Sequence, residues 1–245
     1  AKQKQASKAA NSFTSKLPAA SGVKETKFLG YELLEAQSSV IALWDGLDAV
    51  ESIENNNEIF FATEQTPFYA ESGGQVGDQG EFSGSNGSGQ VVDCIKQGKI
   101  FLHKINLEEG SINLHDTLKL SVAPMMRSDA ASNHSATHLM HAALKHVLGN
   151  HVEQKGSLVD SSKLRFDFSH DEKVSDAALS QIERDINAII LENYSVENDV
   201  KSLDEAKADG AMALFGEKYG DTVRTVIVDN GADRYSYELC GGTHV

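Results

Sequence analysis

A chain of 245 residues is long enough to bury a sizeable hydrophobic core in one or two domains. Its formal net charge of −14 argues against a general nucleic-acid binder, although it leaves room for a metal-centred site that binds one RNA end. No apolar run approaches the roughly 18 residues of a transmembrane helix, and the two cysteines cannot form a disulfide framework. We therefore expect no membrane association and a cytoplasmic location.

Residues 1–27 have the composition of a tail and linker. Ala1 to Ala10 is polar, lysine-rich and helix-prone, and the stretch after it contains Pro18, Gly22 and several serines. The first residue is alanine rather than methionine. We expect this segment to be the end of a preceding region of a longer protein.

Residues 28–122 contain short apolar runs separated by turn residues, without an amphipathic helix between them. This pattern predicts a small β-barrel. Gln97-Gly98 predicts a hairpin turn between two of the strands. The predicted strands are 40–44, 58–62, 91–95, 99–105 and 117–122.

A glycine-rich and aromatic segment, Thr66 to Asp78, interrupts the strand pattern. Its adjacent glycines allow the backbone to approach a ligand closely. It is not a phosphate-binding loop, because no Gly-Lys-Ser/Thr follows. The segment is either an ordinary turn or a loop that faces a ligand.

Residues 123–245 combine helices and strands. A helix that begins at Asn133 as its cap and ends at Gly149 has an apolar stripe on one face. His134, His138 and His141 lie on the other face, so we expect them to face a cleft or a second layer. A second helix begins after the capping Ser175. With predicted strands at 163–168, 222–228 and 234–239, the region is expected to form a two-layer α+β domain with helices packed on an antiparallel sheet.

Four side chains in this domain have the types and spacing of metal ligands. His134 and His138 share a helix face, and Cys240 and His244 are separated by a Gly-Gly pair that suits a tight turn. Imidazole and thiolate together favour one Zn²⁺ over magnesium or calcium. Ser135 stands where a metalloprotease needs a glutamate, which excludes that class. Whether His244 closes the coordination or leaves the fourth position to water or substrate stays open.

Several motifs in order resemble the editing domain of alanyl-tRNA synthetase, over about residues 28–245. Related freestanding trans-editing proteins and threonyl-tRNA synthetase editing domains contain similar segments. The resemblance rests on the segment 66–78 and on His134-Ser-Ala-Thr-His138, Gln154-Lys-Gly-Ser157, Leu164-Arg-Phe-Asp-Phe-Ser169, Gly210-Ala-Met-Ala-Leu-Phe-Gly-Glu-Lys-Tyr219 and Glu238-Leu-Cys-Gly-Gly-Thr-His244.

The resemblance implies a hydrolase that deacylates Ser-tRNA(Ala) and Gly-tRNA(Ala) within a cytoplasmic, ATP-dependent ligase of protein biosynthesis. Its partners would be the tRNA(Ala) acceptor end and the rest of the synthetase chain. The zinc would lie beside the terminal adenosine. The alternative is a zinc-stabilised tRNA-binding module without catalysis of its own.

The resemblance also assigns roles to individual residues. Thr66 matches a threonine associated with the serine hydroxyl, and Thr137 and Gln154 match the editing pocket, where Gln154 would orient water or substrate. The remaining candidates are expected to contact the substrate or the tRNA: Gly73, Gly74, Gln75, Arg165, Asp167 and Lys155. For Arg165 and Asp167 the alternative is a structural ion pair on their strand, and for Lys155 it is a solvated surface position.

Overall fold

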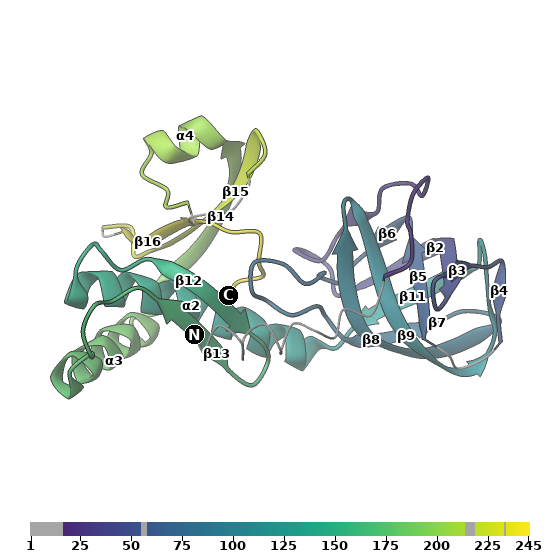
Figure 1. Cartoon of the computed structure of the whole chain (residues 1–245), viewed down its shortest axis with the longest axis horizontal. Helices are drawn as coiled ribbons and strands as arrows, with labels where there is room; N and C mark the ends of the chain where they lie inside the picture. The colour runs from purple at the N-terminus through teal and green to yellow at the C-terminus, as the bar shows by residue number, and fades with distance from the viewer. Residues whose placement is uncertain (1–16, 55–57, 214–218, 233) are drawn as a thin grey trace. The chain divides into compact units, whose positions relative to one another are not determined.

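The computed structural model describes residues 17–54, 58–213, 219–232 and 234–245 (Figure 1). The helix expected at Ala1 to Ala10 and part of the 210–219 motif lie outside the described residues. Contacts divide the chain into two units. The barrel unit contains the chain up to residue 70 and residues 78–122, and the second unit contains residues 71–77 and 123–245. The sequence-based boundaries put 71–77 with the barrel, whereas its contacts are made with the second unit.

The described residues of the barrel unit form strands and turns but no helix. Six of them form a closed antiparallel ring in the order β11-β7-β8-β9-β5-β2, because β2 also pairs with β11. The predicted small β-barrel is therefore confirmed, and closure leaves these six strands without a free edge. The strands are β1 (Lys27–Phe28), β2 (Glu35–Asp45), β3 (Asp48–Ala49), β4 (Ser52–Ile53), β5 (Ile59–Thr63), β6 (Gln65–Thr66), β7 (Gly80–Ser83), β8 (Gly87–Gln97), β9 (Ile100–Gly110), β10 (Ile112–Asn113) and β11 (Thr117–Val122).

Alternating apolar side chains fill the barrel. Along β11, Leu118, Leu120 and Val122 are buried while the residues between them are more exposed. Phe61 and Phe82 meet edge to face inside the ring. The predicted hairpin turn after β8 is confirmed, with Gly98 at a φ of +62°.

The second unit is α+β, as expected, but its strands form two small sheets rather than one. One contains β12 and β13, and the other has the order β14-β15-β16. The polar edge strand β14 was not predicted, because its sequence lacks an apolar alternation. The elements are α2 (Pro124–Leu148), β12 (Gln154–Val159), β13 (Leu164–Phe168), α3 (Asp176–Leu191), β14 (Ser195–Ser202), α4 (Leu203–Ala208), β15 (Thr222–Asp229) and β16 (Arg234–Leu239).

The long helix α2 begins earlier than the sequence analysis expected. Pro124 occupies its first turn, where the missing N–H and the fixed φ suit a helix start. Asn133 is therefore not a cap but lies inside the helix, and its Nδ2 donates to the carbonyl of Asp160 at 2.8 Å. The end at Gly149 is confirmed. Ser175 caps α3 as predicted, accepting from the backbone N–H of Ala178.

Helix α2 is buried on two sides, which positions its histidines. Ala143 and Leu144 pack with Ile182 of α3 in one cluster, together with partly buried aromatic residues of β13. The opposite face packs against β16, so His134, His138 and His141 face a second layer, as expected. In the part of the chain that the structure describes, no helix combines the length and the apolarity needed to cross a membrane.

Candidate metal centre

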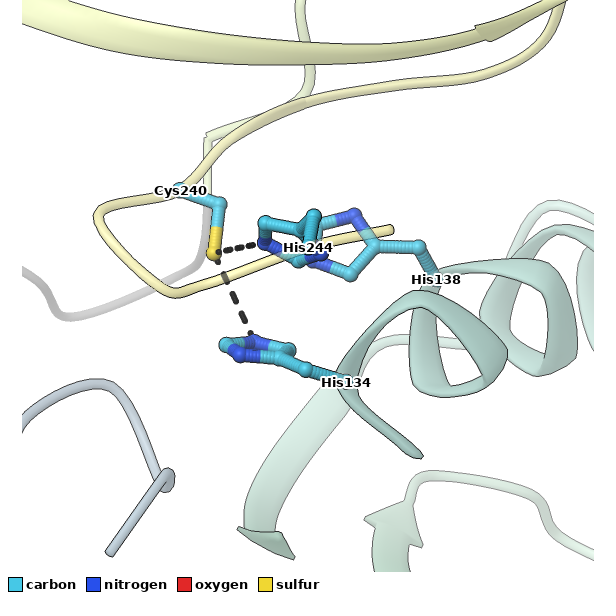
Figure 2. Close-up of side chains that lie close together, drawn as sticks. All are labelled: His134, His138, Cys240 and His244. Atoms are coloured by element: carbon cyan, nitrogen blue, oxygen red, sulfur yellow. Dashed lines mark hydrogen bonds between the residues drawn. The ribbon is translucent and has the colours of Figure 1, made fainter. Parts of the chain in front are cut away.

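Four predicted ligands converge in the second unit. His134 and His138 lie one turn apart on α2 and are only 4% and 5% exposed. Cys240 and His244 lie on the turn that follows β16. Figure 2 shows the four side chains directed toward one another. One donor atom from each lies within 4.8 Å of the others, so the predicted grouping is confirmed as a cluster that could hold a metal ion.

Two pairs of donor atoms have the spacing of a tetrahedral site. Cys240 Sγ lies 3.5 Å from His134 Nε2 and 3.3 Å from His244 Nε2. Bonds of about 2.0–2.3 Å at tetrahedral angles put neighbouring donors roughly 3.3–3.8 Å apart. One thiolate and three imidazoles are a donor set that suits a metal of zinc's type.

Each histidine of the cluster presents its Nδ1 to a second group. His134 Nδ1 lies 2.8 Å from Gln75 Oε1, and His244 Nδ1 lies 3.4 Å from Ser135 Oγ. His138 Nδ1 lies 3.4 Å from the buried carboxylate of Glu238. Such partners orient the ring and leave Nε2 for a metal. His134 and His244 thus direct Nε2 toward the Cys240 thiol, whereas His138 Nδ1 faces Glu238 without a hydrogen bond.

Burial keeps the cluster in the form that metal binding requires. Burial, with help from His138, lowers the pKa of His134 to about 3. It also lowers the pKa of His138 and, strongly, that of His244. All three rings are therefore neutral at pH 7 and have a lone pair available. Burial would raise the pKa of Glu238, but His138 and a hydrogen bond from His141 outweigh it, so the net shift is downward.

The side chain of Arg224, on β15, is hydrogen-bonded to the turn that contains Cys240 and His244. Nη1 of Arg224 donates to the carbonyl oxygens of Cys240 and Gly242 at 3.0 and 2.8 Å, and Nη2 donates to Asn198 Oδ1. A Cβ on Gly242 would collide with the ring of His134. The glycine therefore lets the turn approach α2 closely.

Gln154 and Thr137, the predicted pocket residues, lie on two elements of this unit. Gln154 begins β12, is half-buried, and has its Nε2 3.4 Å from Ser157 Oγ. Thr137 lies between the two helical ligands, is 4% exposed, and donates to the carbonyl of Asn133. Gly73, Gly74 and Gln75 belong to the segment that pairs with β12, since Gln75 bridges to Val159.

The charged candidates pair on the surface. Arg165 and Asp167 form an ion pair at 3.1 Å with both side chains at least half exposed. Lys155 pairs with Glu153 at 2.7 Å and is also exposed. The structural ion pair left open for Arg165 and Asp167 is present. A role of Arg165, Asp167 or Lys155 toward tRNA stays a prediction.

Thr66 belongs to the barrel unit, where its hydroxyl already has two partners. It lies 2.7 Å from His103 Nε2 and accepts from the backbone N–H of Phe68 at 3.1 Å. Thr66 and His103 are both fully buried. His103 is therefore a core residue of the barrel unit. Contact between Thr66 and a serine hydroxyl stays a prediction, and it requires the packing around Thr66 to open.

Sequence reasoning missed the groups that support the ligands. Glu238 lies two residues before Cys240, and strand alternation puts them on one face, which was a usable signal. Its other oxygen lies 3.0 Å from His141 Nδ1. Nothing in the local sequence pointed to Arg224, because its partners come from two other segments.

Comparisons with known proteins agree with the resemblance. The family model described as tRNA synthetases class II (A) matches residues 1–125, so the chain belongs to this family of tRNA synthetases. Its curated relatives include alanine–tRNA ligases. The one from Thermoanaerobacter sp. (strain X514) is 47% identical over 221 residues, 90% of this chain and 25% of the relative. That from Nitrosomonas europaea is 45% identical over 246 residues, 100% of this chain and 28% of the relative. The chain thus spans about a quarter of the length of these relatives.

Proposed function

We propose that this chain is an editing hydrolase that removes serine or glycine wrongly esterified to tRNA(Ala). The proposal is supported by relatives named alanine–tRNA ligase and by a four-donor cluster beside the glycine-rich segment. A pocket for alanine cannot reject glycine by size, and it rejects a near-isostere with one added hydroxyl only weakly. A second, hydrolytic site is the physical solution to that problem.

The observation that carries the proposal is the connection between Gln154 and the ligand cluster. Gln154 contacts Ser157, whose hydroxyl donates to the carbonyl of Gly73 at 3.5 Å. Two residues further on, Gln75 contacts the ligand His134. A half-buried amide is thus tied through one short segment to the cluster. Such an amide can orient an attacking water, although it cannot act as a general base.

The metal would be one Zn²⁺ held by His134, His138, Cys240 and His244. A bound zinc polarises an oxygen only where a coordination position is open, and it otherwise acts as a rigid anchor for the tRNA end. Thr137 would belong to the editing pocket, and Gly73 and Gly74 would let their loop close over it. Lys155 would contact acceptor-stem phosphates, and Arg165 and Asp167 would contact the substrate or the tRNA.

A second candidate function follows from the completeness of the donor set. With four protein donors the metal has no open position, which is typical of structural zinc sites. The chain would then be a zinc-stabilised module that binds the tRNA end without hydrolysing its ester.

Release of labelled amino acid from Ser-, Gly- and Ala-tRNA(Ala) tests the proposal. With one equivalent of Zn²⁺, the chain should release serine and glycine faster than alanine and faster than buffer does. Gln154→Ala should slow serine release about 100-fold, the effect of losing one oriented polar group. Gln181→Ala, a matched change at an exposed position of helix α3, should leave the rate unchanged.

Binding measured in parallel separates the two functions. If wild type binds Ser-tRNA(Ala) but releases serine no faster than buffer, the binding module is correct. If it neither binds nor hydrolyses, both assignments fail for this chain.

A further inference from the structure

The glycine-rich segment 71–77 pairs with the end of β12 through a single parallel bridge between Gln75 and Val159. Val159 donates its backbone N–H to the carbonyl of Gly74 at 2.7 Å and accepts from Val76 at 3.0 Å. Gly73 and Gly74 have φ of +59° and +86°, a region that favours glycine. A Cβ on Gly74 would collide with Ser157. The two glycines therefore let the segment turn and lie directly on β12.

This arrangement delivers the side chain of Gln75 to the ligand cluster. Gln75 is fully buried and makes three side-chain contacts. Its Oε1 lies 2.8 Å from His134 Nδ1 and accepts from the backbone N–H of Thr243 at 3.0 Å. Its Nε2 donates to Thr243 Oγ1 at 2.8 Å. Gln75 is thus bonded to a ligand on α2 and to the turn between Cys240 and His244.

The backbone of Thr243 determines how these hydrogen bonds run. Its N–H can only donate, so the group of Gln75 that faces it must be the oxygen. The same oxygen faces His134 Nδ1, and therefore that nitrogen carries the proton. His134 Nε2, which faces Cys240 Sγ, is left with its lone pair.

The fit around Gln75 is close. A Cβ on Gly242 would lie 3.1 Å from Gln75 Oε1, in addition to its collision with His134. Gln75, His134 and the turn at Gly242 therefore occupy one packed space. A displacement of Gln75 leaves His134 Nδ1 and the N–H of Thr243 without their acceptor.

We propose that Gln75 is a positioning residue of the metal centre, and that metal binding and the order of the segment 71–77 are coupled through it. The inference rests on the metal centre proposed above. Gln75 holds His134 in the ligating tautomer and fastens the Cys240–His244 turn. Because the coupling between the two is reciprocal, a bound metal also restricts the motion of Gln75 and of the segment 71–77 that contains it.

Metal affinity is the first test. Zn²⁺ affinity is measured by competition with a chromophoric chelator, and the Co²⁺ form is examined for the absorption bands of a tetrahedral site with one thiolate. Gln75→Ala should weaken Zn²⁺ binding about 10- to 100-fold and alter the Co²⁺ spectrum. Gln75→Glu should recover much of the affinity, because a carboxylate still accepts from His134 and Thr243. Gln181→Ala is the matched control and should bind as wild type does.

Hydrogen exchange is the second test. Zn²⁺ should slow exchange in a peptide covering 71–77 in wild type and in Gln181→Ala, and should not do so in Gln75→Ala. Urea unfolding of the metal-free proteins separates a general loss of stability from a metal-specific effect.

The outcomes are distinct. If wild type binds no Zn²⁺, the proposed metal centre is wrong and the inference about Gln75 fails with it. Wild type that binds Zn²⁺, with Gln75→Ala equal to it within twofold and the same protection of 71–77, overturns the inference alone. A loss that Gln75→Glu does not recover, with an unchanged Co²⁺ spectrum, also overturns it, since the residue then only fills space.

Discussion

The buried His103 makes the stability of the barrel unit depend on pH. His103 lies on β9, with Nδ1 3.2 Å from the carbonyl of Phe61 on β5 and Nε2 2.7 Å from the hydroxyl of Thr66 on β6. The ring also stacks on Phe61. Thr66 satisfies Nε2 by donating to it, so the neutral ring is the form that this site accommodates.

The size and sign of the effect follow from the pKa of His103. Burial lowers it from 6.5 to about 4, although the hydrogen bond to Phe61 acts in the opposite direction. Between these two values the unfolded chain binds more protons than the folded one, so stability falls as pH drops below 6.5. For one such group the loss between pH 8 and pH 5 is about 2 kcal/mol. Above pH 7 His103 contributes no pH dependence.

Fluorescence of Trp44 provides the assay. Trp44 is the single tryptophan of the chain, lies in β2, and is 2% exposed, so it reports unfolding of the barrel unit. Urea unfolding is followed at pH 8 and at pH 5 for wild type and for His103→Gln. The variant retains an amide that can donate and accept but does not titrate. Contributions from other groups, such as the raised pKa of Asp93, cancel in the difference between the two proteins.

Wild type should lose about 2 kcal/mol more than His103→Gln over this pH range. Equal losses in the two proteins would refute the reasoning, because His103 would then titrate alike in both states. A larger loss of stability in His103→Gln than in wild type would mean that the predicted effect of His103 has the wrong sign.

Further predictions concern the groups around the metal centre and the glycine-rich segment. Glu238→Gln should weaken Zn²⁺ binding about 10- to 100-fold in chelator competition, because a neutral amide with one oxygen replaces the carboxylate whose two oxygens face His138 and His141; binding within twofold of wild type contradicts this. Arg224→Lys should speed Zn²⁺ loss to a chelator, because an ammonium does not reproduce the planar fork on two carbonyls; an unchanged rate contradicts it. Gly74→Ala should destabilise the second unit in thermal unfolding more than Gly73→Ala does, because only its Cβ meets another segment.

Local patterns in the sequence were sufficient for the ligands and for most of the elements. The spacing of His134 and His138 depends only on helix geometry, and the Gly-Gly pair between Cys240 and His244 depends only on turn chemistry. Strand alternation and turn residues predicted the barrel in the same way. The start of α2 was placed too late because Asn133 has a side chain that suits a cap, whereas the helix begins at Pro124, a residue that suits the first turn.

Apart from Glu238, the supporting partners of the site were decided by tertiary structure. Gln75 and Thr243 are 168 residues apart, and Gln75 and His134 are 59 apart, yet they share one buried space. Similarly, the hydroxyl of Thr66 is hydrogen-bonded to His103, which lies 37 residues further along the chain. A sequence states which donors and acceptors a chain carries, whereas burial and pairing arise only when distant segments pack together. That is why the residues able to bind a metal were evident at once, and those that hold them in place were not.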